Sequence, residues 1–357
     1  MKSAMIAMSG GVDSSVAALF MVERGFKCFG VTLKLFDAED SCGRCCSSDD
    51  ALAAKSVCSS LGISHSVFNY KELFENEVIN RFVDSYLEGK TPNPCIDCNR
   101  FIKFSALLKR AVTVGSDCLV TGHYARTEYD TSSSRYLLKR AADKSKDQSY
   151  VLYFLTQEQL ARVVFPLGQL SKKQIRKIAA ENNFVNADKP ESQDICFVSK
   201  GKYHDFIAER AAERCKPASF VDCDGNFLAP SSGIINYTIG QRRGIGVSFN
   251  RPMFVVSKSA EKNTVTLGDE KLLYRHRVLI RDFNFIPFDR LDGTLNVEIS
   301  TRYNEPTTKA IISMYDENHV VADCSVPVRA VSPGQAAVVF QGDIVVGGGS
   351  ICDFTDK

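Results

Sequence analysis

Hydrophobic and polar positions over the first 215 residues follow the pattern of strands separated by helices. The apolar run Ala4–Met8 predicts a buried strand, and a helix follows it to about Arg24, where Gly25 suits a C-cap. Further runs predict strands at 28–36, 66–70 and 117–121, and helices at 49–61, 72–87 and from about 100. Strands that alternate with helices indicate crossover connections and therefore an α/β fold with a doubly wound parallel sheet.

The pattern changes near residue 216, where helical periodicity fades. Short β-type runs take its place at 233–239, 252–257, 264–267, 278–285, 295–300, 309–314 and 336–340. Turn signals such as Asp292-Gly293 and Gly342-Asp343 separate them. These runs predict a small β-rich linker domain over residues 216–270 and a C-terminal β-barrel over residues 271–357, both following a first domain over residues 1–215.

Composition narrows the class of protein. A chain of 357 residues is long enough for two or three domains, and its 44% hydrophobic and 24% charged residues are typical of soluble globular proteins. No apolar run approaches the roughly 18 residues of a membrane span. Because Met1-Lys2-Ser3 leads directly into the first strand, we expect no signal peptide, no membrane association and a cytoplasmic location. Thirteen cysteines in such a protein favour metal or redox chemistry over disulfides.

The charge is distributed unevenly although the net charge is only +2. Basic residues gather in groups, on one predicted helix and again later in the chain: Lys172, Lys173, Arg176 and Lys177, then Arg242, Arg243, Arg275, Arg277 and Arg281. Most such groups are solvated surfaces, so they support a nucleic-acid interface without establishing one.

The stretch Ser9-Gly10-Gly11-Val12-Asp13-Ser14-Ser15 follows the first strand and opens the first helix. Two glycines allow the backbone to approach a ligand closely, and the helix start beyond them offers unpaired N–H groups to a phosphate. The serines add hydroxyl donors, and Asp13 suits either a helix cap or a magnesium ligand. The stretch therefore predicts a phosphate-binding turn.

This turn differs from the common nucleotide loop. The GxxxxGKS or GxxxxGKT loop requires a lysine near its end, and none is present here. SGGVDSS instead resembles the pyrophosphate loop of the ATP pyrophosphatases. That resemblance implies cleavage of ATP between the α and β phosphates, which leaves AMP on a substrate oxygen.

Cysteines form the second candidate site. Cys95 and Cys98 follow the stiff loop Thr91-Pro92-Asn93-Pro94 near a predicted helix start. A helix start lowers the pKa of a nearby thiol. Cys196 lies in another loop-like segment. Three interpretations are open: a catalytic pair of Cys98 with Cys196, an iron–sulfur site on Cys95, Cys98 and Cys196, and a structural zinc site that joins Cys42 and Cys45 to Cys95 and Cys98. The role of Cys42, Cys45 and Cys46 is not decided by the sequence.

Five features together, SGGVDSS, TPNPCIDCNRFIKF, VTGHYAR, KDQSYVLYFL and the late Cys196, resemble the tRNA-specific 2-thiouridylases. The resemblance implies that ATP adenylates the C2 oxygen of the wobble uridine in a tRNA anticodon loop, and that sulfur then displaces AMP to leave 2-thiouridine. It also implies ATP with Mg²⁺ as cofactors, and as partners tRNA and an upstream sulfur donor or relay protein.

The resemblance assigns roles by position. Cys98 matches the catalytic nucleophile, and Cys196 matches the residue that carries a persulfide. ATP-binding positions are Ala7, Met8, Ser9, Gly10, Gly11, Val12, Asp13, Ser14, Leu33 and Gly122. Positions that contact tRNA are Asn93, Pro94, Cys95, His123, Lys146, Asp147, Gln148, Arg302, Tyr303 and Gln335. Asp97, between the two cysteines of the loop, is predicted to be a helix cap.

Two routes of sulfur delivery remain open. In the persulfide route, Cys98 attacks the S–S bond on Cys196 and a Cys98–Cys196 disulfide forms. The second route arises because some members of the family carry aspartate where this chain has Cys95. The three thiols Cys95, Cys98 and Cys196 would suit a 4Fe–4S cluster whose open iron delivers hydrosulfide.

Two other functions are compatible with parts of the sequence. Another ATP pyrophosphatase could adenylate a different RNA base or a small substrate, but such enzymes do not need Cys98 and Cys196. A non-catalytic iron–sulfur or tRNA-binding scaffold would have no use for the ATP loop, so ATP-dependent release of pyrophosphate would exclude it.

Overall fold

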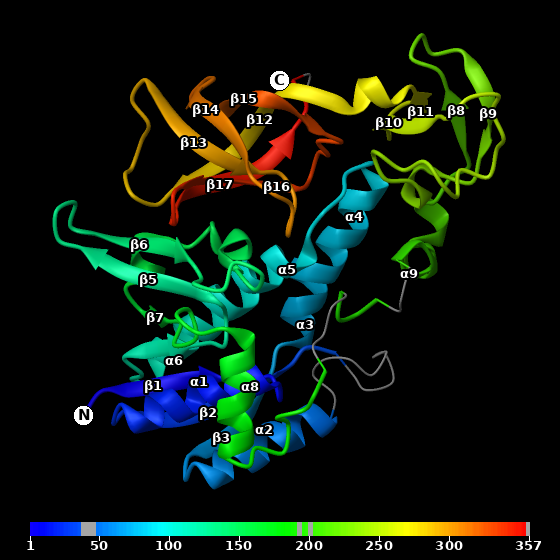
Figure 1. Cartoon of the computed structure of the whole chain (residues 1–357). Coiled ribbons are helices and arrows are strands. Elements are labelled where there is room, and N and C mark those ends of the chain that lie inside the picture. The colour runs from blue at the N-terminus through cyan, green and yellow to red at the C-terminus, as the bar shows by residue number, and fades with distance from the viewer. Residues whose placement is uncertain (37–47, 191–194, 199–202, 355–357) are drawn as a thin grey trace.

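The computed structural model describes residues 1–36, 48–190, 195–198 and 203–354. It confirms the predicted fold class, with a doubly wound parallel sheet at the N-terminus, a small β-rich part and a C-terminal β-barrel. In Figure 1 the barrel lies above the parallel sheet, and the small β-rich part lies beside the barrel. Within these residues, no helix is both long enough and apolar enough to cross a bilayer.

The N-terminal sheet has the strand order β3-β2-β1-β4-β7, and every neighbouring pair is parallel. Its strands are β1 (Ser3–Ala7), β2 (Lys27–Lys34), β3 (Ser64–Asn69), β4 (Cys118–Val120) and β7 (Val163–Val164). Helices and helical turns connect and cover them: α1 (Val12–Glu23), α2 (Ser48–Ser60), α3 (Lys71–Phe74), η1 (Glu75–Asn80), α4 (Arg81–Leu87), α5 (Pro94–Asp97), η2 (Cys98–Leu107), α6 (Leu108–Thr113), η3 (Ser149–Leu152), α7 (Gln157–Leu160), α8 (Lys172–Glu181), α9 (Tyr203–Arg210) and η4 (Ala212–Arg214).

Both faces of this sheet are buried at its central strands, as their apolar sequences require, whereas the edge strand β3 is largely exposed. Alternate residues of β1 belong to different core clusters: Met5 packs with the helices from α3 to α6, whereas Ala4 and Ile6 pack with α1, α2 and α8. The carboxyl ends of β1, β2 and β4 therefore meet at one edge, between two layers of helices, where doubly wound folds bind ligands.

The small β-rich part is a four-stranded sheet with the order β10-β11-β8-β9. It consists of β8 (Ala218–Val221), β9 (Phe227–Ser231), β10 (Phe254–Ser259) and β11 (Thr264–Gly268), with short turns η5 (Ile234–Asn236) and η6 (Glu270–Leu273). The predicted β-run at 233–239 is wrong, because its centre is the helical turn η5. Gly233 enters that turn at φ +129°, a backbone angle outside the β region.

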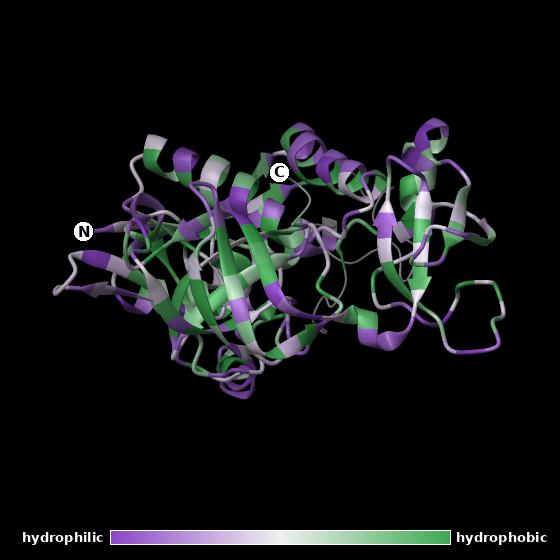
Figure 2. Cartoon of the chain, turned by 90° about the horizontal axis from the view of Figure 1, so that it is seen from above, coloured by the Kyte–Doolittle hydropathy of each residue, from purple (hydrophilic) through white to green (hydrophobic). Residues whose placement is uncertain are grey.

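The C-terminal barrel closes through six strands, because β12 pairs with both β15 and β17. Its strands are β12 (Tyr274–Phe285), β13 (Thr294–Ser300), β14 (Thr308–Met314), β15 (His319–Arg329), β16 (Ala336–Gln341) and β17 (Ile344–Cys352). Figure 2 shows hydrophobic and hydrophilic bands alternating along several strands, as expected where one strand face meets a core and the other meets solvent. The boundaries at 215 and 270 stay predictions.

A hairpin from the N-terminal part attaches to the barrel. Strands β5 (Ala125–Asp130) and β6 (Arg135–Arg140) pair with each other, and Lys139 of β6 pairs with Ile344 of β17. Arg126 forms an ion pair with Asp343, 2.9 Å away. The sequence analysis did not predict this hairpin, which fixes the barrel against the N-terminal part.

Candidate functional site

The turn between β1 and α1 has an internal hydrogen-bond frame built by its serines. The hydroxyls of Ser14 and Ser15 donate to the carbonyl oxygen of Gly11 at 2.9 and 3.1 Å, and the Ser9 backbone N–H donates to the Ser14 hydroxyl. Gly10 has φ +73°, and a Cβ at this position would lie 2.7 Å from the Asp50 Cα. Only glycine fits such a position without displacing α2.

Asp13 has two polar partners in the first turn of α1. Its carboxylate accepts a hydrogen bond of 2.7 Å from the Tyr124 hydroxyl, and the Lys172 ammonium lies 2.8 Å from both of its oxygens. The helix N-cap is Gly11, and no side chain caps it. The capping role that the sequence allowed for Asp13 is therefore wrong, whereas its carboxylate remains beside the turn as a candidate metal ligand.

A cavity of about 240 Å³ opens at this turn. It is lined by Ala7, Met8, Ser9, Asp13, Ser14, Val31, Thr32, Leu33, Leu35, Lys103, Thr121, Gly122, His123 and Gln148. Seven residues predicted to bind ATP are among them, while Gly10, Gly11 and Val12 form the turn behind the cavity wall. Gly122 lies so close to α1 that a Cβ would be 2.8 Å from the Ser14 backbone nitrogen.

Five lining residues were not predicted as site residues: Val31, Thr32, Leu35, Lys103 and Thr121. Thr32 donates its hydroxyl to the Met8 carbonyl oxygen at 2.7 Å, which ties β2 to the turn. Thr32 and Thr121 lie at the carboxyl ends of β2 and β4, so the edge rule for parallel sheets could have found them. Lys103 lies on the helical run after Cys98, where no local signal points toward the turn.

His123 forms part of the wall of this cavity. Its ring Nδ1 lies 2.8 Å from the Thr121 hydroxyl oxygen, and the ring packs against Phe104 and Phe165. Burial lowers the pKa of this imidazole well below its usual range, so it is neutral at physiological pH. The predicted tRNA contact at His123 would therefore have to form through the cavity.

Cys95 and Cys98 lie on one helical run. Asn93 is the N-cap of α5, because its side-chain oxygen accepts the Cys95 N–H at 3.1 Å, and Pro94 occupies the first helical position. The helix thus begins near Pro94, earlier than the predicted start at about 100. It widens into π geometry from Cys98, a distortion that is frequent at functional sites.

Cys196 packs against the same hydrophobic cluster as Cys98. The following residue, Phe197, contacts Phe82 of α4 with ring centroids 5.4 Å apart. Arg81, the neighbour of Phe82, lies over the ring of Phe101 on the Cys98 helix, at 4.8 Å. The first turn of α4 therefore contacts both cysteine-bearing segments.

The described residues contain no group of three or more His, Cys, Asp or Glu side chains arranged to hold a metal ion. Cys95, Cys98 and Cys196 are among these residues, and they are not part of such a group. Cys42, Cys45 and Cys46 lie outside the described part of the chain, and so does half of the zinc set considered above.

Asp97 does not cap the helix as predicted, because Asn93 does so. Burial raises the pKa of the Asp97 carboxyl to about 6, against the opposing effect of Arg81 and Arg100. The Asp97 carboxylate lies 3.9 Å from the Arg81 guanidinium in a polar cavity behind the Cys98 helix, lined also by Arg100 and by the barrel residue Arg281. Sequence reasoning missed this cavity, whose walls come from distant segments.

The Lys146-Asp147-Gln148 motif builds a loop beside the cavity. Asp147 accepts hydrogen bonds from the backbone N–H groups of Ala141 and Ser149, and Gln148 accepts one from the Tyr124 N–H at 3.0 Å. Two of the three predicted tRNA contacts therefore use side-chain oxygens to shape the loop. Lys146 is half-buried on the same loop.

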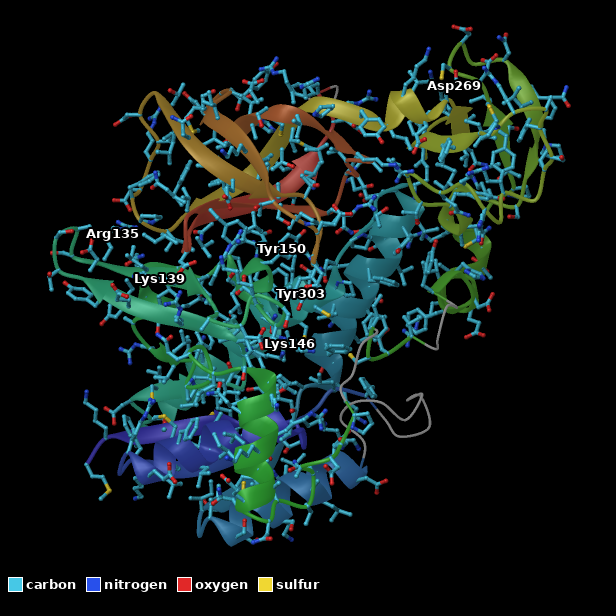
Figure 3. All side chains as sticks on the ribbon, viewed as in Figure 1. Arg135, Lys139, Lys146, Tyr150, Asp269 and Tyr303 are labelled. Atoms are coloured by element: carbon cyan, nitrogen blue, oxygen red, sulfur yellow. The ribbon has the colours of Figure 1, made fainter. Side chains whose placement is uncertain are left out.

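Arg302 and Tyr303 lie between β13 and β14 of the barrel. Figure 3 shows Tyr303 close to Tyr150 near the boundary between the barrel and the N-terminal part, and their ring centroids are 5.8 Å apart. Tyr303 is 38% exposed, whereas the Tyr150 hydroxyl donates to the Ala336 carbonyl oxygen. The Arg302 guanidinium donates to the Ala330 carbonyl oxygen at 2.9 Å.

Gln335, the last predicted tRNA contact, lies on the barrel turn before β16. Its side-chain amide donates a hydrogen bond of 2.7 Å to the carbonyl oxygen of Thr91, in the loop that leads to Cys95 and Cys98. The structure thus places Gln335 beside the loop that leads to the cysteines, and its amide holds that loop by a hydrogen bond.

Comparison with known proteins covers nearly the whole chain. Residues 2–200 match the family described as tRNA methyl transferase HUP domain. Residues 204–269 match the family described as tRNA methyl transferase PRC-barrel domain. Residues 275–351 match the family described as aminomethyltransferase beta-barrel domain. Full-length relatives carry a different name. The tRNA-specific 2-thiouridylase MnmA of Acetivibrio thermocellus is 45% identical over 355 residues, which is 98% of this chain and 99% of the relative.

Two more relatives bear the name tRNA-specific 2-thiouridylase MnmA. The protein from Natranaerobius thermophilus is 42% identical over 360 residues, covering 99% of this chain and 98% of its own. The protein from Clostridioides difficile is 43% identical over 353 residues, covering 98% of each chain.

Proposed function

This chain belongs to the family of tRNA-specific 2-thiouridylases, and from that premise we propose that it is an ATP-dependent tRNA sulfurtransferase that converts the wobble uridine into 2-thiouridine. One structural observation carries the proposal. The cavity at the β1–α1 turn is lined by seven of the residues that the ATP loop predicts, in a chain whose two candidate sulfur-handling cysteines pack against a common core.

The turn suits the phosphates of ATP. Gly10 and Gly122 allow the turn to pack closely against α2 and the end of β4, which holds it in place. Ser9 and Ser14 supply hydroxyls, and the α1 N-terminus supplies N–H groups and a positive dipole end. Magnesium held by Asp13 would neutralise phosphate charge. The apolar walls formed by Ala7, Met8 and Leu33 suit the adenosine.

The chemistry begins with the uridine C2 oxygen, which attacks the α phosphorus of ATP as pyrophosphate leaves. The terminal sulfur of a Cys196 persulfide then attacks C2, and AMP leaves with the oxygen. Next, Cys98 as the thiolate attacks the Cys196 sulfur, which breaks the S–S bond, frees 2-thiouridine and forms a Cys98–Cys196 disulfide. A two-electron reductant and a sulfur donor or relay protein must restore Cys196 for another cycle.

We derive the chemistry through the persulfide route, which needs only the two thiols Cys98 and Cys196. Cys95, Cys98 and Cys196 do not converge as a ligand group, so we derive no step through a 4Fe–4S cluster. Cys95 is exposed in the first turn of α5, next to Asn93 and Pro94, where it suits contact with the target base.

The tRNA surface would extend from this loop to the barrel. Tyr303 offers an exposed aromatic ring for a base, and Lys146, labelled with it in Figure 3, supplies positive charge nearby. Arg302, the residue before Tyr303, adds a second positive charge. An anticodon loop suits such a surface, because its bases leave the stack at low cost.

The test is incubation of the purified protein with unmodified tRNA, ATP–Mg²⁺, a persulfide as sulfur donor and a thiol reductant, followed by mass spectrometry of the digested nucleosides. ATP-dependent 2-thiouridine is the expected product. ATP cleavage without a thionucleoside would retain the ATP site and overturn the tRNA uridine as substrate. Absence of ATP cleavage, with tRNA present, would overturn the adenylation step as well.

A further inference from the structure

A turn of the barrel, residues 332–335, contacts the loop before the helix that carries Cys95 and Cys98. Both peptide groups of Thr91 are used: its N–H donates to the Pro333 carbonyl oxygen at 2.9 Å, and its carbonyl oxygen accepts from the Gln335 side chain at 2.7 Å. Thr91 is two residues before Asn93, which caps the helix that carries Cys95 and Cys98.

Gly334 sets how closely this turn approaches the loop. It has φ +87°, and a Cβ at this position would lie 2.9 Å from the Lys90 Cβ and 3.1 Å from the Thr91 nitrogen. Any other residue would be strained in its backbone and would push the turn away from the loop.

The turn is held on its other side by the barrel itself. The Gly334 N–H donates to the Ile351 carbonyl oxygen, and the Ile351 N–H donates to the Gln335 carbonyl oxygen at 2.8 Å. Arg302 fixes the chain just before the turn, because its guanidinium reaches the carbonyl oxygen of Ala330 and lies 3.4 Å from the Ser332 hydroxyl. One rigid segment therefore joins the proposed tRNA surface to the cysteine loop.

We infer that the 332–335 turn is a positioning device, in which Gly334 and Gln335 hold the Thr91 loop so that Cys98 meets a uridine bound against the barrel. This inference rests on the proposed function. It gives Gln335 a role through Thr91 in addition to the tRNA contact that the resemblance implies. Small displacements of a reacting group cost up to about 100-fold in rate, so the contact bears on the chemical step more than on tRNA affinity.

The experiment compares Gly334→Ala and Gln335→Ala with Gly293→Ala in the full-length protein. Gly293 is a matched control: it is also a barrel glycine with positive φ, +74°, but a Cβ there would meet nothing within 4 Å. Three readouts are taken for each protein: single-turnover thiolation at saturating tRNA, the Kd for tRNA, and hydrogen–deuterium exchange at the Thr91 amide.

We expect thiolation by Gly334→Ala and Gln335→Ala to fall roughly 10- to 100-fold, with the tRNA Kd changed less than about threefold and faster exchange at Thr91. Thiolation by Gly293→Ala should match the unaltered protein. Rates in Gly334→Ala equal to those of the control would overturn the inference, as would a loss in Gln335→Ala that appears only in the tRNA Kd. If the unaltered protein made no 2-thiouridine, the proposed function would fail separately, and unchanged exchange at Thr91 would still refute the contact.

Discussion

The Lys172 ammonium lies 2.8 Å from both carboxylate oxygens of Asp13, a residue of the turn that we propose binds phosphate. Lys172 is the first residue of α8, and its side chain is only 11% exposed. A cation at a helix N-terminus opposes the helix dipole, so packing alone does not favour it there. The pair places a positive charge beside the proposed phosphate site and compensates the Asp13 carboxylate.

Replacing Lys172 with methionine should weaken ATP–Mg²⁺ binding by roughly tenfold or more, the value of one lost charge-assisted hydrogen bond. The physical reason is that the proposed phosphate site would lose the positive charge of the Lys172 ammonium beside it. Equilibrium dialysis with labelled ATP measures the change. Lys173→Met is the matched control, because Lys173 is the next residue of α8 and is exposed. Equal affinities in the two variants would contradict a role for Lys172 at the phosphates.

Cys98→Ala and Cys196→Ala should each reduce 2-thiouridine formation to background while tRNA affinity is retained. Each substitution removes one sulfur of the exchange, and no other described cysteine is predicted to replace it. Mass spectrometry of digested tRNA and a filter-binding titration check the two halves of this expectation. The exposed Cys223, far along the chain in the small sheet, provides the control Cys223→Ala. Thiolation by either catalytic variant at the control rate would refute the persulfide mechanism.

Gly10→Ala should abolish ATP binding and lower the free energy of unfolding by roughly 2–5 kcal/mol, because a left-handed alanine is strained and its Cβ meets the backbone of Asp50. Gly25→Ala has a similar φ of +77° with open space around the Cβ, and should cost about 1–2 kcal/mol while ATP binding persists. Urea unfolding and nucleotide titration measure both variants. Retained ATP binding in Gly10→Ala would show that the turn does not cradle phosphate.

The apolar runs of the sequence were enough to predict the architecture, because buried strands in a doubly wound sheet are continuous and hydrophobic. Two of the elements that were missed, β17 and the β5–β6 hairpin, lack this pattern. β17 contains Gly347, Gly348 and Gly349, which barrel packing explains: a Cβ on Gly348 would lie 2.7 Å from the Ala337 carbonyl oxygen. The β5–β6 hairpin is rich in charged residues and is stabilised by contacts with the distant barrel.

The candidate site also contains residues that the sequence could predict and residues that it could not. Residues of the β1–α1 turn could be predicted because the chemistry is contiguous in sequence. No local pattern could pair Lys172 with Asp13, because 159 positions separate them. The same holds for Gln335 and Thr91, which are 244 positions apart. The environment of Asp97 was equally hidden, because its burial depends on α4 and the barrel together.

Tyr303→Ala should weaken tRNA binding by roughly tenfold, since stacking of a base on an aromatic ring contributes about 1–3 kcal/mol. Tyr303→Phe keeps the ring and should retain the affinity of the unaltered protein. The Kd for an unmodified tRNA, measured at fixed salt, distinguishes the two. A loss of affinity in both variants would point to the hydroxyl in place of stacking, and no loss in either would remove Tyr303 from the proposed tRNA surface.

Lys258 provides a test of how the small sheet is held to α4. Its ammonium donates to the Tyr237 carbonyl oxygen at 2.8 Å and lies 5.8 Å from the ring centroid of Tyr86 on α4. Burial lowers the pKa of this lysine to about 8, whereas in the unfolded chain it is about 10.4. Between these two pH values the unfolded state binds the extra proton, so this group makes the folded protein more stable as the pH rises from 8 to 10.4.

Lys258→Met cannot show that pH dependence, because it has no proton to lose. Relative to the unaltered protein, its free energy of unfolding should therefore fall by about 3 kcal/mol between pH 7 and pH 10.5, the value of a shift of about two pKa units. Groups that titrate in both proteins, Tyr86 among them, cancel in this difference. Urea unfolding of both proteins across the pH range gives the measurement. A difference that stays constant with pH would mean that Lys258 is not desolvated at the boundary between the small sheet and α4.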